Sequence, residues 1–193
     1  MIRQGLLLLA LTLLLGGCGS SPPAPVDRFY RLQPSALPAA ATLPATLEIR
    51  NVRGDSLYAE RPIVFSDAAD ARQLRQYHYH LWLYPPAQMV RDHFRASLAG
   101  AGNAGSGGKP SLSLDARIVS FERVLSGKAS TAQVALEVTV LSGEKPLLSK
   151  QYSAAQAAGD DSFSAFSAAM ELALNRIYGE VLGDIGRLDL KPR

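Results

Sequence analysis

Residues 111–141 read SLSLDARIVSFERVLSGKASTAQVALEVTVL and hold the two clearest strand patterns of the chain. In Ala132–Leu141, apolar and polar side chains alternate, with one face made of Val134, Leu136, Val138 and Val140 and the other carrying Gln133, Glu137 and Thr139. A period of two is typical of a strand buried on one face. Ser111–Val124 has the same character, but its apolar phase slips after Ile118, which predicts a bulge or a fully buried stretch. We expect these two strands to pair antiparallel.

The segment after these strands predicts one long amphipathic helix. Asp160-Asp161-Ser162 offers capping side chains and negative charge at its N-terminus. Apolar residues then recur at helical spacing, namely Phe163, Phe166, Met170, Leu174, Ile177, Val181, Ile185 and Leu188. Glycines at 179, 183 and 186 weaken the last turns by roughly 1 kcal/mol each relative to alanine. The end of this helix is therefore expected to fray or kink.

Between these elements and upstream of them, shorter patterns complete the sheet. Leu147–Ala155 predicts one more hairpin strand. The aromatic segment Tyr77–Tyr84 predicts a strand that leads into a helix, because Pro85-Pro86 suits a first helical turn. Residues of that helix recur at helical spacing, namely Val90, Phe94, Leu98 and Ala101.

The N-terminal part of the domain is expected to add three short strands. They are Phe29–Gln33, Thr46–Val52 with Leu47, Ile49 and Asn51 on one face, and Arg61–Phe65. Ser66–Arg75 is expected to form a short helix or a loop. The whole pattern predicts an α/β fold with a mixed, largely antiparallel sheet packed against helices and a long C-terminal amphipathic helix.

The first 18 residues have the organisation of a bacterial lipoprotein signal. Arg3 precedes the apolar run Leu6–Leu15, which is too short to span a bilayer and is placed like the apolar region of an export signal. Leu15-Gly16-Gly17-Cys18 then matches the lipobox recognised by lipoprotein-processing enzymes. We expect residues 1–17 to be cleaved off between Gly17 and Cys18. The Cys18 thiolate would carry the diacylglyceryl group as a thioether, together with an N-acyl chain on its amine.

Residues 18–28 are expected to tether the domain 29–193 to the membrane. The segment GSSPPAPV, from Gly19 to Val26, is small, polar and rich in proline. At about 3.1 Å per residue in a polyproline II conformation it would hold the domain within roughly 25–30 Å of the membrane. Resemblance to bacterial lipoproteins implies inner-membrane retention when Asp follows the lipidated cysteine. Because Gly19 follows here, we expect the outer membrane, with the domain facing the periplasm.

Composition argues against several function classes. Cys18 is the only cysteine, which leaves none for a disulfide or a thiolate metal site. The chain has 20 basic and 17 acidic residues and no basic cluster, so we expect no nucleic-acid partner. The glycine-rich Gly102–Lys109 fails as a phosphate-binding loop, because Asn103 stands where the first glycine is needed and Pro110 where Ser or Thr is needed. We expect no nucleotide and no other cofactor.

Histidine clusters and hydrolase motifs are the remaining features that could indicate an active site. His78 and His80 lie two apart on an expected strand and could in principle form a three-histidine metal site with His93. A packed aromatic surface that includes Trp82 and Tyr84 is the better interpretation, because no carboxylate lies beside them in the strand. No G-x-S-x-G or H-E-x-x-H motif is present. We therefore expect no catalytic residues and no metal site, and we expect Trp82 to fill the seam between sheet and helix.

Several of these segments, in this order and spacing, resemble the ABC-type transport auxiliary lipoproteins, which include the lipoprotein partner of the paraquat-inducible MCE transport system. The matching segments are Phe29-Tyr30-Arg31-Leu32, Glu60-Arg61-Pro62-Ile63-Val64, Tyr79-His80-Leu81-Trp82 with Pro85, Val119-Ser120-Phe121-Glu122 and the Ser/Ala-rich C-terminal helix. Leu83-Tyr84 departs from the family, in which this position is typically Ala-Glu. The resemblance implies a compact α/β domain and a role beside an ATPase, a permease and a periplasmic MCE protein that carries lipids between membranes.

The resemblance leads to one expected function and leaves two alternatives. We expect an outer-membrane lipoprotein that docks the periplasmic MCE protein of an ABC transport system, as a single copy or as a ring of identical subunits. A lipoprotein that binds lipid directly or assists outer-membrane assembly is the main alternative, and a structural envelope lipoprotein is the third. An apolar pocket able to hold acyl chains would favour the lipid binder, whereas an exposed self-complementary patch would favour docking.

Overall fold

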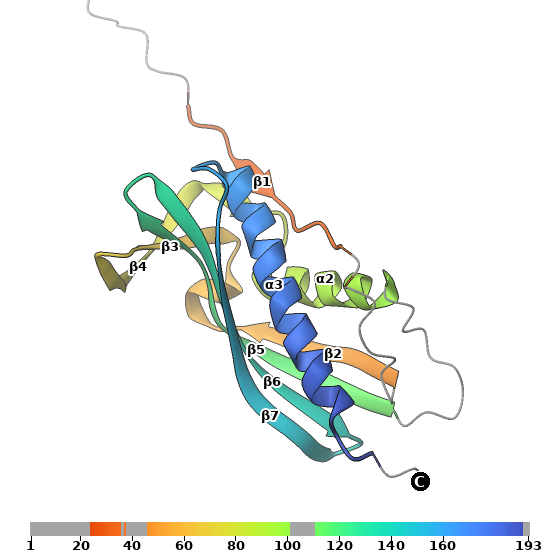
Figure 1. The fold of residues 1–193 in the computed structure, drawn as a ribbon. Helices are drawn as coiled ribbons and strands as arrows, with labels where there is room; N and C mark the ends of the chain where they lie inside the picture. Colours follow the sequence, from red (N-terminus) through yellow and green to blue (C-terminus); the bar gives the residue numbers. More distant parts are fainter. Residues whose placement is uncertain (1–23, 36, 38–45, 101–110, 191–193) are drawn as a thin grey trace, which may run out of the picture.

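Strand β5 (Ser111–Ser126) is the centre of the sheet, as the computed structural model of the chain shows (Figure 1). The structure describes residues 24–35, 37, 46–100 and 111–190. The other strands are β1 (Arg28–Tyr30), β2 (Thr46–Gly54), β3 (Pro62–Asp67), β4 (Asp70–Trp82), β6 (Ala129–Ser142) and β7 (Lys145–Ala157). Across the sheet they lie in the order β1-β4-β3-β5-β6-β7, and β2 also pairs with β5.

Two different strands share one side of β5. β2 runs parallel to its first half, beside Ser111 to Ile118, and β3 runs parallel to its second half, beside Glu122 to Leu125. The other side of β5 pairs antiparallel with β6 along nearly its full length, and β6 pairs antiparallel with β7. The short 3-10 helix η1 (Ser56–Ala59) connects β2 to β3. The expected fold class, a mixed sheet packed against helices, is confirmed.

Helix α3 (Phe163–Gly186) lies across one face of the sheet, and α2 (Pro86–Gly100) lies beside it (Figure 1). α2 begins at Pro86, where the absent N–H group would have no partner in a first turn anyway. α3 begins after Ser162, whose side chain accepts a hydrogen bond from the Ala165 N–H at 3.1 Å. α3 ends at Gly186, so the helix continues through Gly179 and Gly183 before it stops. No helix in the described part of the chain is long and apolar enough to cross a membrane.

The core lies between the sheet and the two helices. The even-numbered residues of β6 from Ala132 to Val140 are buried toward α3, as the alternation predicted. From α3, eight apolar residues fill the seam, namely Phe166, Met170, Ala173, Leu174, Ile177, Tyr178, Val181 and Ile185. The ring of Phe94 from α2 stacks on Tyr178 at 3.9 Å between centroids. The two helices are therefore joined by the same core that they share with the sheet.

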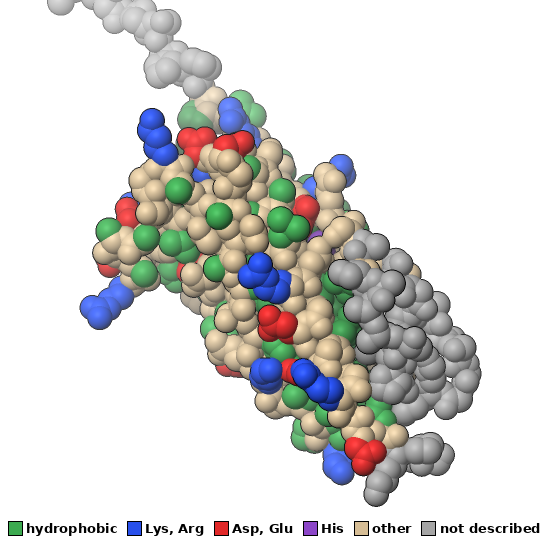
Figure 2. Space-filling model, in the orientation of Figure 1, with side chains coloured by type: hydrophobic (Ala, Val, Ile, Leu, Met, Phe, Trp, Pro, Cys, Tyr) green, Lys and Arg blue, Asp and Glu red, His purple; other side chains and the backbone are tan. Residues whose placement is uncertain are grey.

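Asp184, near the end of α3, attaches the helix to strand β7. Its carboxylate accepts hydrogen bonds from Lys150 Nζ at 2.8 Å and from the Tyr152 hydroxyl at 2.7 Å, and it also pairs with Arg187. The hydrogen bond from Lys150 and that from Tyr152 lower the pKa of Asp184 well below its usual range. Figure 2 shows basic and acidic side chains next to one another on this face of the molecule. The helix is thus held at its C-terminal end, where the glycines weaken it.

Two sequence predictions were wrong. Ser66–Arg75 is neither a helix nor a loop, because it contains the end of β3, a tight turn and the first six residues of β4. In β2, Val52 rather than Asn51 is buried, because an irregularity between Ile49 and Asn51 shifts the register against β5. Such a bulge exchanges the faces of all later residues in a strand. In contrast, the phase slip predicted in β5 is confirmed as a register shift between Ile118 and Ser120.

Candidate functional site

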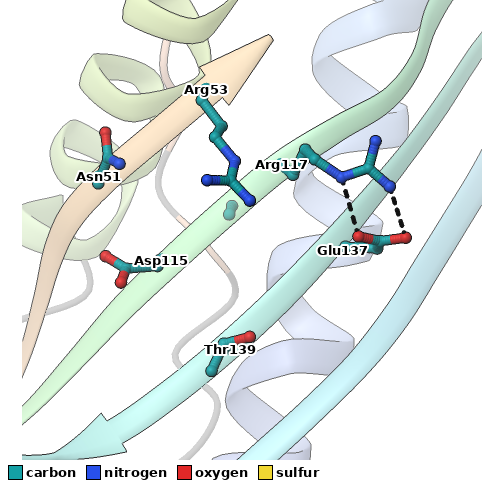
Figure 3. Close-up of a pocket in the computed structure, with 7 residues that line it drawn as sticks. Asn51, Arg53, Asp115, Arg117, Glu137 and Thr139 are labelled. Carbon is teal, nitrogen blue, oxygen red and sulfur yellow. Dashed lines mark hydrogen bonds and ion pairs between the residues drawn. The ribbon is translucent and has the colours of Figure 1, made fainter. Parts of the chain in front are cut away.

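One face of the sheet, formed by β2, β5 and β6, has no described helix over it and is polar. α3 and α2 cover the opposite face, so the side chains that alternate outward on β5 and β6 meet solvent. A shallow hollow of about 220 Å³ lies on this face. Figure 3 shows its polar lining residues, namely Asn51, Arg53, Asp115, Arg117, Glu137 and Thr139. We call this surface the open face.

Paired charges hold the side chains of the open face in defined positions. Arg117 on β5 donates two hydrogen bonds to Glu137 on β6, at 3.0 and 2.8 Å (Figure 3). Arg50 on β2 forms a similar two-point pair with Asp115 on β5. The hydrogen bond from Arg50 lowers the pKa of Asp115, and the hydrogen bond from Arg117 lowers the pKa of Glu137. All four groups are therefore ionised at neutral pH.

These ion pairs contribute little to the stability of the fold. Their side chains are about one-third to one-half exposed, and exposed pairs typically contribute less than about 1 kcal/mol. Two-point pairing does fix the direction of each guanidinium and carboxylate. Arg53 adds a further positive charge, since its side chain extends from β2 toward β5 (Figure 3). The open face is thus a polar surface with charges of both signs in fixed positions, and these charges add little to the stability of the fold.

Farther along β5, the outward carboxylate of Glu122 is buried. The Tyr58 hydroxyl in η1 donates a hydrogen bond to Glu122 at 3.0 Å, and Gln133 Nε2 donates a longer one at 3.4 Å. Burial raises the pKa of Glu122 above its usual value. A carboxyl group with a raised pKa is sometimes an acid catalyst. Here its contacts attach η1 to the sheet.

An aromatic cluster joins β1, β4 and the first turn of α3. The His80 ring stacks on Phe163 at 3.7 Å between centroids, and the Tyr30 hydroxyl and His80 Nδ1 share a hydrogen bond of 2.9 Å. Tyr77 contacts the edge of Phe163, and the Arg123 guanidinium lies 4.6 Å from the centre of that ring. Burial, helped by the nearby charges of Arg28 and Arg123, lowers the pKa of His80. This cluster fixes β1, and with it the point where the chain enters the domain.

The structure does not bring the three histidines together. His80 lies against Phe163 at the start of α3, whereas His93 lies against Tyr178. Phe163 and Tyr178 are fifteen residues apart on the helix, which separates them by about 22 Å at 1.5 Å per residue. His78 is exposed, while its expected partner on the same face, His80, is half-buried. Within the described ranges, no group of three metal-binding side chains is found. The aromatic interpretation holds for His80 and Trp82, whereas Tyr84 lies past the end of β4 and is exposed.

His93 should make the stability of the fold depend on pH. It is 3% exposed, and the Tyr178 hydroxyl is within hydrogen-bond distance of its Nδ1. Burial lowers the pKa of His93 to about 4. Between pH 6.5 and 4 the unfolded chain therefore binds a proton that the folded chain does not, and the free energy of unfolding should decrease as the pH falls through this range.

From pH 7 to pH 5, we expect His93 to account for a loss of about 2 kcal/mol, at about 1.4 kcal/mol per pH unit below 6.5. Urea unfolding at both pH values measures it. His93→Gln should lose less stability over this interval, and His78→Gln, at an exposed position, should behave like the unchanged chain. An equal loss in the His93→Gln variant and in the unchanged chain would contradict the assignment.

Gly17 and Cys18 lie outside the described residues, as does the glycine-rich segment 102–109. Sequence reasoning did not find the ion pairs of the open face. Glu137 was assigned correctly to the polar side of its strand, but its partner depends on the register of β5 against β6. Arg50 and Asp115 are separated by 65 residues and come together only because β2 runs parallel to β5.

Comparison with known structures identifies the fold. A crystal structure of a Xanthomonas campestris protein of the family DUF330 superposes with a TM-score of 0.69 at 19% sequence identity, covering 81% of this chain and 93% of that chain. A crystal structure of an uncharacterised protein superposes with a TM-score of 0.61 at 14% identity, covering 84% and 97% of the two chains. No curated protein matches the sequence significantly.

The sequence itself identifies the family. The family model for the ABC-type transport auxiliary lipoprotein component matches residues 30–181. This range runs from the last residue of β1 to the C-terminal half of α3, and so contains almost all of the described fold. The chain belongs to the family of ABC-type transport auxiliary lipoprotein components.

Proposed function

We propose that this chain is a non-enzymatic docking lipoprotein of the outer membrane. The lipid on Cys18 would anchor it to the periplasmic side of that membrane, and the domain would bind the periplasmic MCE-domain protein of an ABC transport system. Membership of the auxiliary lipoprotein family supports a role beside a transporter. The lipobox, which ends at Cys18, supports the anchor, and Gly19 after it supports the outer membrane rather than the inner one.

The observation that carries the docking role is the open face. Two-point ion pairs between neighbouring strands add little stability to an exposed sheet surface, but they hold the charges in fixed positions. Fixed charges of both signs do give orientation and specificity to a protein complex, because a partner must match them in position. Arg50–Asp115 and Arg117–Glu137 supply such a pattern within a few residues of each other.

The position of the open face also suits a partner in the periplasm. β1, where the chain enters the domain, lies at one end of the molecule in Figure 1, and the C-terminal part of α3 lies at the other. β2 and the paired first half of β5 lie toward the latter end (Figure 1). If the tether emerges toward the membrane, the open face is turned toward the periplasmic space.

The alternative role as a lipid carrier receives less support. An acyl-chain site is normally an enclosed apolar cavity. In the part of the chain that the structure describes, the side chains of one hydrophobic core pack between the sheet and the helices. A larger hollow of about 610 Å³, lined mainly by aromatic residues of β3 and β4, is open to solvent rather than enclosed.

Charge reversal on the open face tests the proposal. Arg117→Glu removes the pair with Glu137 and places two carboxylates side by side, so the affinity for the cognate MCE protein should fall by about tenfold or more. The matched control is Arg176→Glu, at an exposed position on α3. Arg176→Glu should unfold within about 0.5 kcal/mol of the unchanged chain, because its site is exposed. Arg117→Glu should lose about 1–2 kcal/mol, because it breaks an ion pair and sets two like charges opposite each other on paired strands, but it should remain folded.

The affinity is measured by calorimetry or by surface-based binding with the purified periplasmic MCE protein. A folded Arg117→Glu variant that binds as tightly as the Arg176→Glu control would exclude the open face as the docking surface.

A further inference from the structure

Exposed apolar side chains gather along one edge of the sheet. Among the described residues, seven large hydrophobic side chains are exposed, and six of them lie on β1, on β4 or in the residues next to these strands. Five of these six lie near the place where β1 pairs with the end of β4, since Phe29 is opposite Leu81. These five, which we call the edge patch, are Val26, Phe29, Tyr79, Leu83 and Tyr84. Leu74 lies apart from them, five residues before Tyr79 and roughly 17 Å away along β4. The seventh, Leu172, lies on α3. Scattered apolar residues need no explanation, but a cluster marks a contact surface.

The edge patch combines aromatic rings with arginines. The Arg61 guanidinium lies 4.9 Å from the centre of the Phe29 ring, and the Arg75 guanidinium lies 4.8 Å from that of Phe65. Next to them is the open aromatic hollow, whose lining includes Tyr77 and Tyr79. Tyrosine and arginine each have an apolar body and a polar tip, so they suit a boundary between apolar and aqueous phases. Tyrosine is enriched at the interface between membrane and water for this reason.

The patch also includes the point where the chain enters the domain. Val26 and Phe29 lie on either side of Arg28, the first residue of β1, and are eight and eleven residues after Cys18. At about 3.1 Å per residue in a polyproline II conformation, eight to eleven residues span roughly 25–34 Å. A folded domain of the size of residues 29–193 has a radius of gyration of roughly 15 Å, so the tether is no longer than about the diameter of the domain. The surface within reach of the edge patch is therefore the membrane that holds the lipid.

We infer that the edge patch rests on the phospholipid surface to which the chain is anchored, with Phe29, Tyr79 and Tyr84 inserted among the headgroups. The inference rests on the lipid anchor of the proposed function and extends it from a point attachment to an oriented one. The domain would then not rotate freely on its tether. Its open face would be held toward the periplasm, ready for the partner.

Site-specific labelling tests the contact in the full lipidated chain. Cys18 is the only cysteine and its sulfur carries the lipid, so each added cysteine is the only free thiol. Tyr79→Cys and Tyr84→Cys place a thiol in the patch, at positions 44% and 51% exposed. Leu172→Cys is the matched control, since it is 57% exposed on α3. Each variant is labelled with an environment-sensitive fluorophore and reconstituted in phosphatidylethanolamine–phosphatidylglycerol vesicles that contain nitroxide-labelled lipid.

Labels at 79 and 84 should shift to shorter emission wavelengths and be quenched by the nitroxide, because interfacial side chains lie roughly 5–10 Å into the boundary between headgroups and acyl chains. The label at 172 should show neither effect. If the chain stays on the vesicles but all three labels behave alike, the inference is wrong while the anchor stands. If the chain leaves the vesicles, the lipid anchor and the inference both fail. A wavelength shift that grows with protein density and occurs without quenching would instead show that the patch contacts a second copy of the chain.

Discussion

Trp82→Ala is expected to lower the free energy of unfolding by about 3–5 kcal/mol, the usual cost of truncating a fully buried tryptophan. Trp82 ends β4 and is 1% exposed. Its ring lies 5.3 Å from that of Phe121 on β5 and 5.7 Å from that of Phe166 on α3. The variant would leave a cavity where the sheet meets the helix, as expected for a residue that fills this seam. Denaturant unfolding followed by circular dichroism measures the loss.

Tyr84→Ala serves as the matched control for this prediction. It removes another aromatic ring only two residues away, but this ring is 51% exposed, so the change should stay within about 0.5 kcal/mol. An unfolding midpoint of Trp82→Ala equal to that of the unchanged chain would show that the ring does not contribute to the core.

Cys18→Ser is expected to abolish lipidation and leave the export signal attached, because serine cannot form the thioether that precedes cleavage. The chain should then lose its incorporation of labelled fatty acid and no longer fractionate with the outer membrane. Two neighbouring variants sharpen the test. Ser20→Ala keeps the lipobox and should change nothing, whereas Gly19→Asp should keep the lipid but move the protein to the inner membrane.

Fractionation of Cys18→Ser with the outer membrane, and with lipid label intact, would refute the anchor at this residue. A Gly19→Asp variant that remains in the outer membrane would leave the anchor in place but contradict the sorting rule on which the localisation depends.

The parts of the fold that were predictable are those in which burial repeats with a regular period. β6 and α3 each bury one face against the same core, so their apolar residues recur every two residues or at helical spacing. The first half of β4 was missed for the opposite reason. Residues 70–75, with the sequence DARQLR, are exposed on both sides of the strand, so no core imposed an apolar pattern on them. Only the hairpin pairing with β3 makes this segment a strand.

The candidate sites divide in the same way. The lipobox is a local motif, so the prediction that Cys18 is lipidated needs only the four residues that end with it. The open face and the edge patch, in contrast, depend on the register in which neighbouring strands pair. Arg117 meets Glu137 because of the antiparallel pairing of β5 with β6, and Phe29 lies beside Leu81 because of the parallel pairing of β1 with β4. A bulge of one residue would separate either pair, and a single sequence does not determine such shifts.

The most direct test of the account is binding between a soluble version of the domain that starts at Asp27 and its cognate periplasmic MCE protein. This version lacks the anchor and tether but keeps all of β1, so we predict a saturable complex in solution. Binding should be less effective than at a membrane, where anchoring raises the local concentration. The account would be contradicted by a folded, monodisperse domain that binds no MCE protein and instead extracts phospholipid from vesicles. The chain would then be a lipid carrier.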